Sequence, residues 1–371
     1  MKVFMAGKTA KMAINLIMLI ILLFVHIEQQ GGVYAVFFNL DEAEDISDSI
    51  IRIFRNRNDA IINGDLKLIE SLYDTNTKYG IWAHQHELAK VKYIHNWEQK
   101  QGVKFIKIVP AVKVRSIKPK GEKLTFNLLC SAEYRYIYEN EPDKVNSFRI
   151  GTYHVLDLLN KDGTWIITRE WYKDPFEDFL DLKKMNVDSI NQYISTHEAR
   201  DLSGIGNRRQ NAVKYADRYC GAASEERHGY RYNNKYRNYN SLGGDCANFA
   251  SQILHEGGEF RKNYTWNYDS KGATRAWINA EGFKNYMLYS GRASLIACGK
   301  YEKVYKASYK LLPGDFIAYE KKGDIIHISV VTGADSKGYS LVSCHNTDRN
   351  RAPWDLGWNS DIRFWLIHVH F

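Results

Sequence analysis

One cysteine, Cys246, stands where a thiol could act as a nucleophile. It lies in the segment 243–258, which begins and ends with pairs of glycines. The apolar spacing in this segment predicts a helix that starts at Cys246, with Asp245 at its N-cap. A thiol in the first turn of a helix meets unpaired N–H groups and the positive end of the helix dipole, which favours the thiolate. The pattern predicts a nucleophilic cysteine with Asp245 supporting the site, although helix capping alone also accounts for Asp245.

A cysteine nucleophile needs a base, and the later strands offer one. His327 lies in the middle of a predicted strand over residues 325–332. His345 and Asn346 directly follow the next predicted strand, and either side chain could orient an imidazole. The order cysteine, histidine, polar residue is that of papain-like enzymes.

Two other histidine pairs are poor candidates for metal ligands. His84 and His86 are two residues apart in a predicted helix, so they point to different faces. His368 and His370 share one face of a predicted strand but lack a third ligand. The sequence contains neither His-Glu-x-x-His nor Cys-x-x-Cys. We therefore expect no metal and no organic cofactor.

The residues around Cys246 resemble the nucleophile motif of the bacterial “putative amidase domain” family, a papain-like group related to CHAP and NlpC-type cell-wall hydrolases. The resemblance covers residues 207–371. It rests on four ordered blocks: the opening helix at 207–216, the motif at 243–252, Leu312-Pro313-Gly314-Asp315 with the strand 326–332, and His345-Asn346-Thr347-Asp348.

The resemblance implies that Cys246 is the nucleophile and that His327 is the general base and acid. His345 is then the preferred group to orient the imidazole, with Asn346 as the alternative. The backbone N–H of Cys246 would be one oxyanion donor. The implied reaction is acyl transfer through a thioester, which water then hydrolyses, and it needs no cofactor.

The first half of the chain has a different pattern. Apolar residues at helical spacing over 46–72 predict two helices that meet near Asp65, and a third helix is predicted over 87–99. Long β-rich runs follow. Asp162-Gly163 predicts a hairpin turn, because that turn needs positive φ. Helices followed by an antiparallel meander predict an α+β cone, and this half resembles the SnoaL-like, nuclear-transport-factor-like fold.

The N-terminus has the pattern of an export signal. Three lysines precede an apolar run over residues 13–25, which is short for a membrane span of about 20 residues. Val33-Tyr34-Ala35 predicts cleavage after Ala35, with an uncleaved anchor as the alternative. We expect a signal peptide at 1–35, an α+β domain at 36–184, a linker at 185–206 and a papain-like α+β hydrolase domain at 207–371. The mature protein is expected to be secreted, without stable membrane insertion.

Composition indicates the class of protein, and net charge indicates the kind of partner. The 371 residues are 44% hydrophobic and 25% charged, which is typical of a globular chain of about two domains and excludes collagen-like or coiled-coil architectures. Five cysteines are too few for a disulfide scaffold. The net charge of +8 resides in residues 207–371, whereas residues 36–206 carry −2. We expect peptidoglycan or another anionic cell-wall polymer as the partner, and no nucleic acid.

The function predicted from the sequence is an exported cysteine amidase or peptidase that cleaves amide bonds in peptidoglycan. Two alternatives remain open. One is a non-catalytic wall-binding module with a papain-like shell. The other is a general secreted cysteine peptidase that acts on proteins.

Overall fold

The computed structural model describes residues 28–29, 32–33 and 40–371. The apolar run of the expected signal and its expected cleavage position after Ala35 lie outside these residues. Within the described part of the chain, no helix has both the length and the apolar character needed to span a membrane. The short strands β1 (Glu28–Gln29) and β2 (Gly32–Val33) pair with each other.

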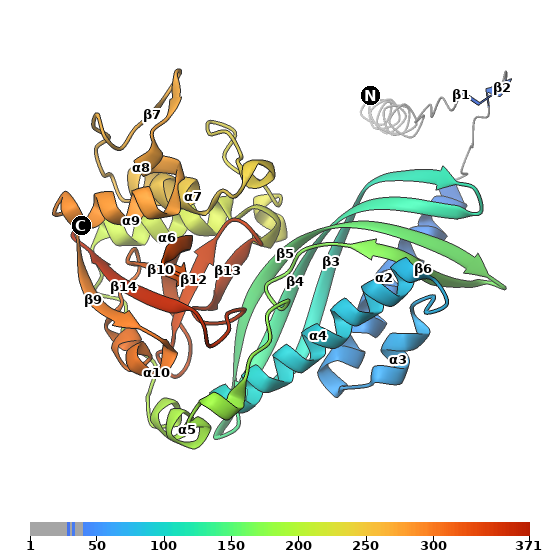
Figure 1. Cartoon of the computed structure of the whole chain (residues 1–371), viewed down its shortest axis with the longest axis horizontal. Helices are drawn as coiled ribbons and strands as arrows, with labels where there is room; N and C mark the ends of the chain where they lie inside the picture. Colours follow the sequence, from blue (N-terminus) through green and yellow to red (C-terminus); the bar gives the residue numbers. More distant parts are fainter. Residues whose placement is uncertain (1–27, 30–31, 34–39) are drawn as a thin grey trace, which may run out of the picture.

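In the first half of the chain, helices pack against a long antiparallel sheet (Figure 1). The elements are α2 (Leu40–Asn63), α3 (Leu66–Ser71), α4 (Lys78–Gln101), β3 (Val103–Lys120), β4 (Lys123–Tyr138), β5 (Glu141–Lys161) and β6 (Thr164–Trp171). Asp65 caps α3 by accepting a hydrogen bond from the Leu68 N–H, and Asp162 and Gly163 both take positive φ in the β5–β6 turn. The predicted α+β class and this hairpin are confirmed.

The segment expected to be a linker, 185–206, contains a helix, α5 (Val187–Ser195). Ile190 and Ile194 lie one turn apart and are both buried, so α5 docks on the rest of the fold. Val187, Ile190 and Ile194 recur at helical spacing after the N-cap residue Asn186, so the sequence does carry a signal for α5, which the prediction of a linker overlooked.

In the second half of the chain, short helices cover a sheet. The helices are α6 (Asn207–Tyr219), α7 (Cys246–Gln252), α8 (Arg275–Ile278), α9 (Ala280–Tyr289) and α10 (Tyr301–Val304). Residues Ile253–Gly257 continue α7 as a π-helix, and single 3₁₀ turns cover Leu182–Lys184, Gly221–Ala223, Glu226–His228, Asn240–Leu242 and Ala307–Lys310. The strands are β7 (Tyr268–Asp269), β8 (Gly272–Ala273), β9 (Ala293–Gly299), β10 (Phe316–Lys321), β11 (Asp324–Ala334), β12 (Ser340–Cys344), β13 (Arg349–Pro353) and β14 (Arg363–Val369).

The two halves share one ten-stranded antiparallel sheet. Its order is β3-β4-β5-β13-β12-β11-β10-β14-β9, with β6 also paired to β5. The junction is the pairing of β5 with β13, where Ile150 is opposite Arg349. Gly151 is next in β5, and a Cβ atom there would lie 2.2 Å from the backbone of Ala222. The joint is therefore closely packed, and the halves are not separated by a flexible connection.

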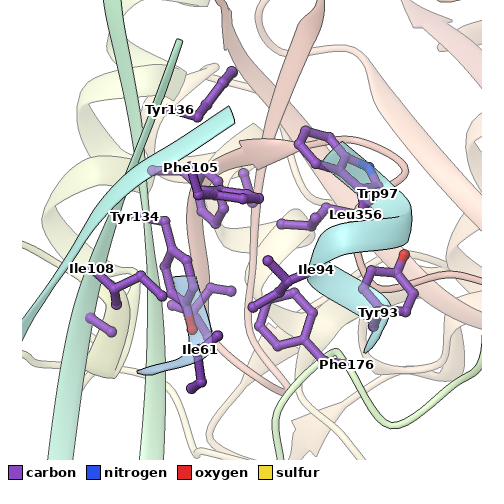
Figure 2. Packing of buried hydrophobic residues seen from close by; sticks show 14 of the residues in the cluster. Ile61, Tyr93, Ile94, Trp97, Phe105, Ile108, Tyr134, Tyr136, Phe176 and Leu356 are labelled. Atoms are coloured by element: carbon purple, nitrogen blue, oxygen red, sulfur yellow. The ribbon is translucent and has the colours of Figure 1, made fainter. Parts of the chain in front are cut away.

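A common core reinforces this joint. Figure 2 shows Leu356, from the loop between β13 and β14, beside Trp97 of α4. In the same layer Lys100 of α4 forms a buried ion pair with Asp355, and Trp97 Nε1 donates a hydrogen bond to the same carboxylate at 3.1 Å. The first half of the chain therefore helps to build the loop that follows β13.

Candidate active site

Cys246 is the first residue of α7, as predicted. Gly243 and Gly244 precede it with φ of 113° and 133°, values that side chains rarely adopt, so these glycines permit the turn into the helix. Asp245 stands at the N-cap, but its carboxylate accepts no capping hydrogen bond from a backbone N–H of the helix. Its Oδ1 accepts hydrogen bonds from the Tyr239 N–H at 2.9 Å and from Asn248 Nδ2 at 2.8 Å. Simple capping therefore does not explain Asp245.

The thiol of Cys246 opens on a pocket of about 360 Å³. The residues that line the pocket are Tyr239, Leu242, Gly243, Gly244, Cys246, Ile278, Asn279, Ala280, Ile325 and Ile326. Cys246 itself is only 7% exposed, and this burial raises its pKa to about 12. Hydrogen bonds with the backbone of Ile328 and Ala247 oppose the rise but do not outweigh it. In this arrangement the thiol is protonated at neutral pH, in contrast to the thiolate expected from its place at a helix start.

His327 lies in β11, but it does not line this pocket. Its ring packs beside the stacked pair of Tyr319 and Trp358, with both ring centroids 5.4 Å away. Its neighbour Ile328 faces the other way, into the apolar cluster that contains Phe249 of α7. The expected contact between His327 and the thiol is therefore absent, and Cys246 has no hydrogen bond to a histidine within the described residues.

A β-bulge lies directly before His327 in β11. In the pairing of β10 with β11, Tyr319 is opposite His327 and Glu320 is opposite Ile325, so Ile326 is an extra residue. Such a bulge changes the face on which the following side chains lie. Ile325 and Ile328 both join the cluster on the α7 side, and His327 falls on the opposite face. Alternation from Ile328 places His327 on that opposite face, whereas the shared face of Ile325 and Ile328 results from the bulge.

The imidazole of His327 is neutral and has a free nitrogen. Burial lowers its pKa well below the ordinary histidine value, and the positive charge of Arg349 lowers it further. Its Nε2 is buried and has no hydrogen-bond partner among the described residues. A neutral imidazole with an unused nitrogen has the electronic properties of a general base, although the thiol is not within its reach here.

His345 is bonded on both nitrogens. Nδ1 lies 2.6 Å from Asp245 Oδ2, and Nε2 lies 2.8 Å from the carbonyl oxygen of Tyr219. Both partners are acceptors, so the ring is an imidazolium that donates twice. Burial lowers its pKa, but the bond to Asp245 and the charge of that carboxylate outweigh burial and raise the pKa overall. His345 also stacks on Phe249 with ring centroids 3.7 Å apart, so it is held in place and has no lone pair to accept a proton.

Asn346 lies beside the turn that leads into α7. It takes a φ of 70°, and its Nδ2 would lie 3.1 Å from a Cβ atom placed on Gly244. The structure thus brings together Asp245, Cys246, His345 and Asn346 around one turn, and places His327 on the far face of β11.

Sequence reasoning missed two residues near this site, Asn279 and Trp358. Asn279 lines the thiol pocket and caps α9, and Trp358 covers His327. Both are far from Cys246 in the sequence, so no local pattern connects them to it. In the tyrosine-rich segment 230–239, Tyr239 lines the pocket, whereas Tyr236 packs on Trp277.

His368 and His370 bond to protein groups. His368 Nδ1 lies 3.1 Å from Asp315 Oδ2, and His370 bonds the carbonyl oxygen of Gly291 and the hydroxyl of Ser294. Within residues 40–371, no group of three or more His, Cys, Asp or Glu side chains is arranged to hold a metal ion.

Comparison with known families gives one match in this region. Residues 206–367 match the model of the family described as “putative amidase domain”. We call this stretch the amidase region. The match agrees with the amidase resemblance predicted from the motif, and it suggests amide-bond hydrolysis. Its relationship to papain-like, CHAP and NlpC-type enzymes stays a prediction.

Two curated proteins from Bacillus subtilis (strain 168) resemble the chain. “Uncharacterized protein YhbB” is 26% identical over 194 residues, which are 49% of this chain and 57% of that protein. “Uncharacterized protein YjcM” is 30% identical over 176 residues, which are 46% of this chain and 37% of that protein. The chain thus spans about half or less of the length of these relatives.

Solved structures give weaker likenesses. One is a chain whose name begins Rd1NTF2. The match includes 35% of the present chain and 99% of the Rd1NTF2 chain, with a TM-score of 0.21 and 16% sequence identity. The other is an LEH-like epoxide hydrolase from M. tuberculosis. The match includes 34% of the present chain and 84% of the hydrolase chain, with a TM-score of 0.16 and 14% sequence identity. Both likenesses are too slight to support an inference.

Proposed function

We propose that the amidase region hydrolyses an amide bond in peptidoglycan outside the cytoplasm, with Cys246 as the nucleophile. The observation that carries the proposal is the thiol of Cys246 at the wall of a pocket of about 360 Å³, within a region that matches an amidase family. A pocket of this size accommodates a small peptide or amino-sugar group.

His327 is the proposed base. To act, its imidazole has to leave its position beside Tyr319 and Trp358 and turn toward the thiol. The bulge at Ile326 lies directly before it, and bulges next to active sites re-aim side chains. The Cys246 sulfur already contacts the backbone of Ile328, the next residue along β11, so the displacement required is local.

The proposed reaction then follows the usual course of a cysteine hydrolase. His327 takes the Sγ proton, and the sulfur attacks the amide carbonyl to form a tetrahedral adduct. The imidazolium returns the proton to the leaving amine as the C–N bond breaks, which leaves a thioester. Water, deprotonated by the same imidazole, hydrolyses the thioester and regenerates the thiol.

The pair of His345 and Asp245 acts as a positioning unit in this proposal. The charge of Asp245 raises the pKa of the Cys246 thiol, so the pair contributes by holding the turn that carries Cys246 in place. Asp245 fixes both the His345 ring and the backbone of Tyr239, a residue of the pocket wall. Neither side chain needs to touch the substrate.

The first half of the chain supports the same site through Trp358. Tyr93 of α4 accepts a hydrogen bond from the Gly357 N–H at 2.7 Å and donates one to the carbonyl oxygen of Trp358 at 3.1 Å. Trp358 stacks on Tyr319 with ring centroids 4.3 Å apart and borders His327. The packing around His327, the proposed base, therefore depends on both halves of the chain.

Substrate and location rest on charge and on the N-terminal pattern. The net charge of +8 on residues 207–371 favours approach to an anionic polymer such as a bacterial wall, and the signal-like N-terminus directs the chain to it.

Purified sacculi test the proposal. We expect the wild-type chain to release new amino termini without new reducing ends, and Cys246→Ala to release none. A thiol-alkylating reagent supplied with substrate should label Cys246 faster than Cys298, a partly exposed cysteine. Cleavage of casein without release from sacculi would identify a general peptidase instead.

A non-catalytic module is the second candidate, and one observation favours it. The Cys246 thiol is buried with a raised pKa and is not bonded to an imidazole. This candidate predicts slow alkylation of Cys246, and binding to sacculi that is the same for wild type and Cys246→Ala.

A further inference from the structure

A second pocket lies in the first half of the chain, where the N-terminal end of α4 approaches β6. Its volume is about 510 Å³, within the range of small-molecule sites. It shares no lining residue with the pocket at Cys246, and Figure 1 places β6 and α7 at opposite sides of the molecule. We call it the α4–β6 groove.

Three exposed aromatic side chains line the α4–β6 groove. Tyr79 and Trp82 of α4 are each 54% exposed, and Trp171 at the end of β6 is 62% exposed. Large aromatic rings in water lose their main source of stabilisation, so several around one hollow indicate a binding surface. The edge-to-face contact of Tyr79 with Trp82, at 5.7 Å, keeps two of the rings in a defined arrangement.

The base of the groove is polar but electrically balanced. Glu170 lines the groove and is held from behind by Arg57 at 2.6 Å and by His154 Nδ1 at 2.7 Å. Burial raises the pKa of Glu170, but Arg57 and His154 outweigh burial and lower it, so the carboxylate is charged. His86 also lines the groove, and its Nε2 is buried without a hydrogen-bond partner among the described residues.

Burying so many ionisable groups is expensive, and such networks contribute little net stability. The network next to Glu170 includes Glu87, whose Oε2 is also buried without a partner in the described part of the chain, and Arg57, whose Nε is in the same state. These two groups lie behind the groove and do not line it, so what indicates a ligand site is the groove's own aromatic and charged lining.

The charges around the rim exclude two classes of ligand. A cation would meet Lys173, Arg169 and Lys78, and Lys78 already occupies the region over the Trp82 ring at 4.6 Å. A dense anion such as a phosphate would meet the carboxylate of Glu177. The groove instead suits an uncharged molecule with apolar faces for the rings and hydroxyl groups for donors and acceptors at its edge.

A sugar ring has these properties: its C–H face packs on an aromatic ring, and its hydroxyls hydrogen-bond with charged and amphoteric side chains. We propose that the α4–β6 groove is a binding site for the uncharged sugar rings of a glycan. The inference goes beyond the proposed amidase function and does not depend on Cys246, although a glycan site would hold a wall-cleaving enzyme on its polymer.

The full-length chain tests the inference with a β-1,4-linked tetramer of N-acetylglucosamine, an uncharged probe without a peptide. We expect saturable binding, measured by calorimetry and by quenching of tryptophan fluorescence. Trp82→Ala and Trp171→Ala should each weaken binding by about tenfold or more, a loss of about 1.4 kcal/mol. Tyr289→Ala removes an aromatic ring that is 87% exposed on α9, and it serves as the matched control.

Binding of the tetramer by Cys246→Ala with wild-type affinity is expected and would separate this site from the proposed catalytic one. The inference is overturned if the tetramer does not bind, or if Trp82→Ala and Trp171→Ala bind it as tightly as Tyr289→Ala does. Saturable binding of tetramethylammonium or of free stem peptide, in place of the tetramer, would also overturn it.

Discussion

The Nδ1 atom of His345 lies 2.6 Å from Oδ2 of Asp245, the residue directly before Cys246. The two partners are 100 positions apart in the chain, and both side chains are almost fully buried. This pair fixes the turn from which the thiol projects, so its protonation is coupled to the structure of the candidate site.

Asp245→Asn should reveal this coupling. Because the folded-state pKa of His345 is raised, the ion pair stabilises the fold fully below the unfolded value of about 6.5, and this contribution is lost as pH rises through the folded pKa. At pH 6 the variant should therefore lose about 3 kcal/mol in the free energy of unfolding, and the difference from wild type should narrow at pH 9. Urea unfolding at both pH values measures it, with exposed Asp361→Asn as the control. A difference that does not change with pH would contradict the ion pair.

His327→Phe should separate catalysis from stability. The pKa of His327 is depressed, so the unfolded chain binds a proton that the folded chain resists, and wild type should lose stability as pH falls below about 6.5, by up to about 1.4 kcal/mol per pH unit. The phenylalanine variant should lack this loss and should reduce amide hydrolysis by about a hundredfold or more. Denaturant unfolding at pH 7 and pH 5, together with the sacculus assay, measures both effects. His370→Phe, at an exposed position, is the control. Wild-type hydrolysis by His327→Phe would remove His327 from the proposed mechanism.

Lys100→Met should destabilise both halves of the chain together. Lys100 is 1% exposed and forms its ion pair with Asp355, so the substitution leaves a buried carboxylate without its counter-charge, at a cost of about 3 kcal/mol. We expect one cooperative transition, seen at the same denaturant concentration by tryptophan fluorescence and circular dichroism. Lys104→Met, on the exposed side of β3, provides the matched comparison. Two separate transitions in the wild type would mean that the halves are independent domains.

Gly151→Ala tests the junction of the shared sheet. The added methyl group would lie 2.2 Å from the backbone of Ala222. The contact between β5 and the 3₁₀ turn Gly221–Ala223 would therefore have to open. We expect a loss of about 2 kcal/mol in stability and lower hydrolysis, since β13 leads into the loop that carries Trp358. Gly204→Ala, which meets no atom within 4 Å, should have little effect. Equal stabilities of the two variants would argue against a rigid joint.

The turns and the helix start of this protein could be predicted from its sequence, because they depend on local chemistry. Gly243 and Gly244 permit the turn, Cys246 begins the helix that follows, and Asp162-Gly163 forms the predicted hairpin, because each of these features depends on residues adjacent in the chain. The α+β class and the amidase region follow from patterns of the same local kind. Such patterns name the groups that could do chemistry.

The tertiary structure determines which residues these chemically active side chains contact. His327 lies on the face of β11 opposite Ile328, away from the thiol, and which face of a strand packs on α7 is not revealed by the strand pattern alone. The pairing of β5 with β13 and the contact of Asp245 with His345 join residues far apart in the sequence. Such contacts are selected by the packing of the whole core, and the same packing sets the burial that raises the pKa of Cys246 and lowers that of His327.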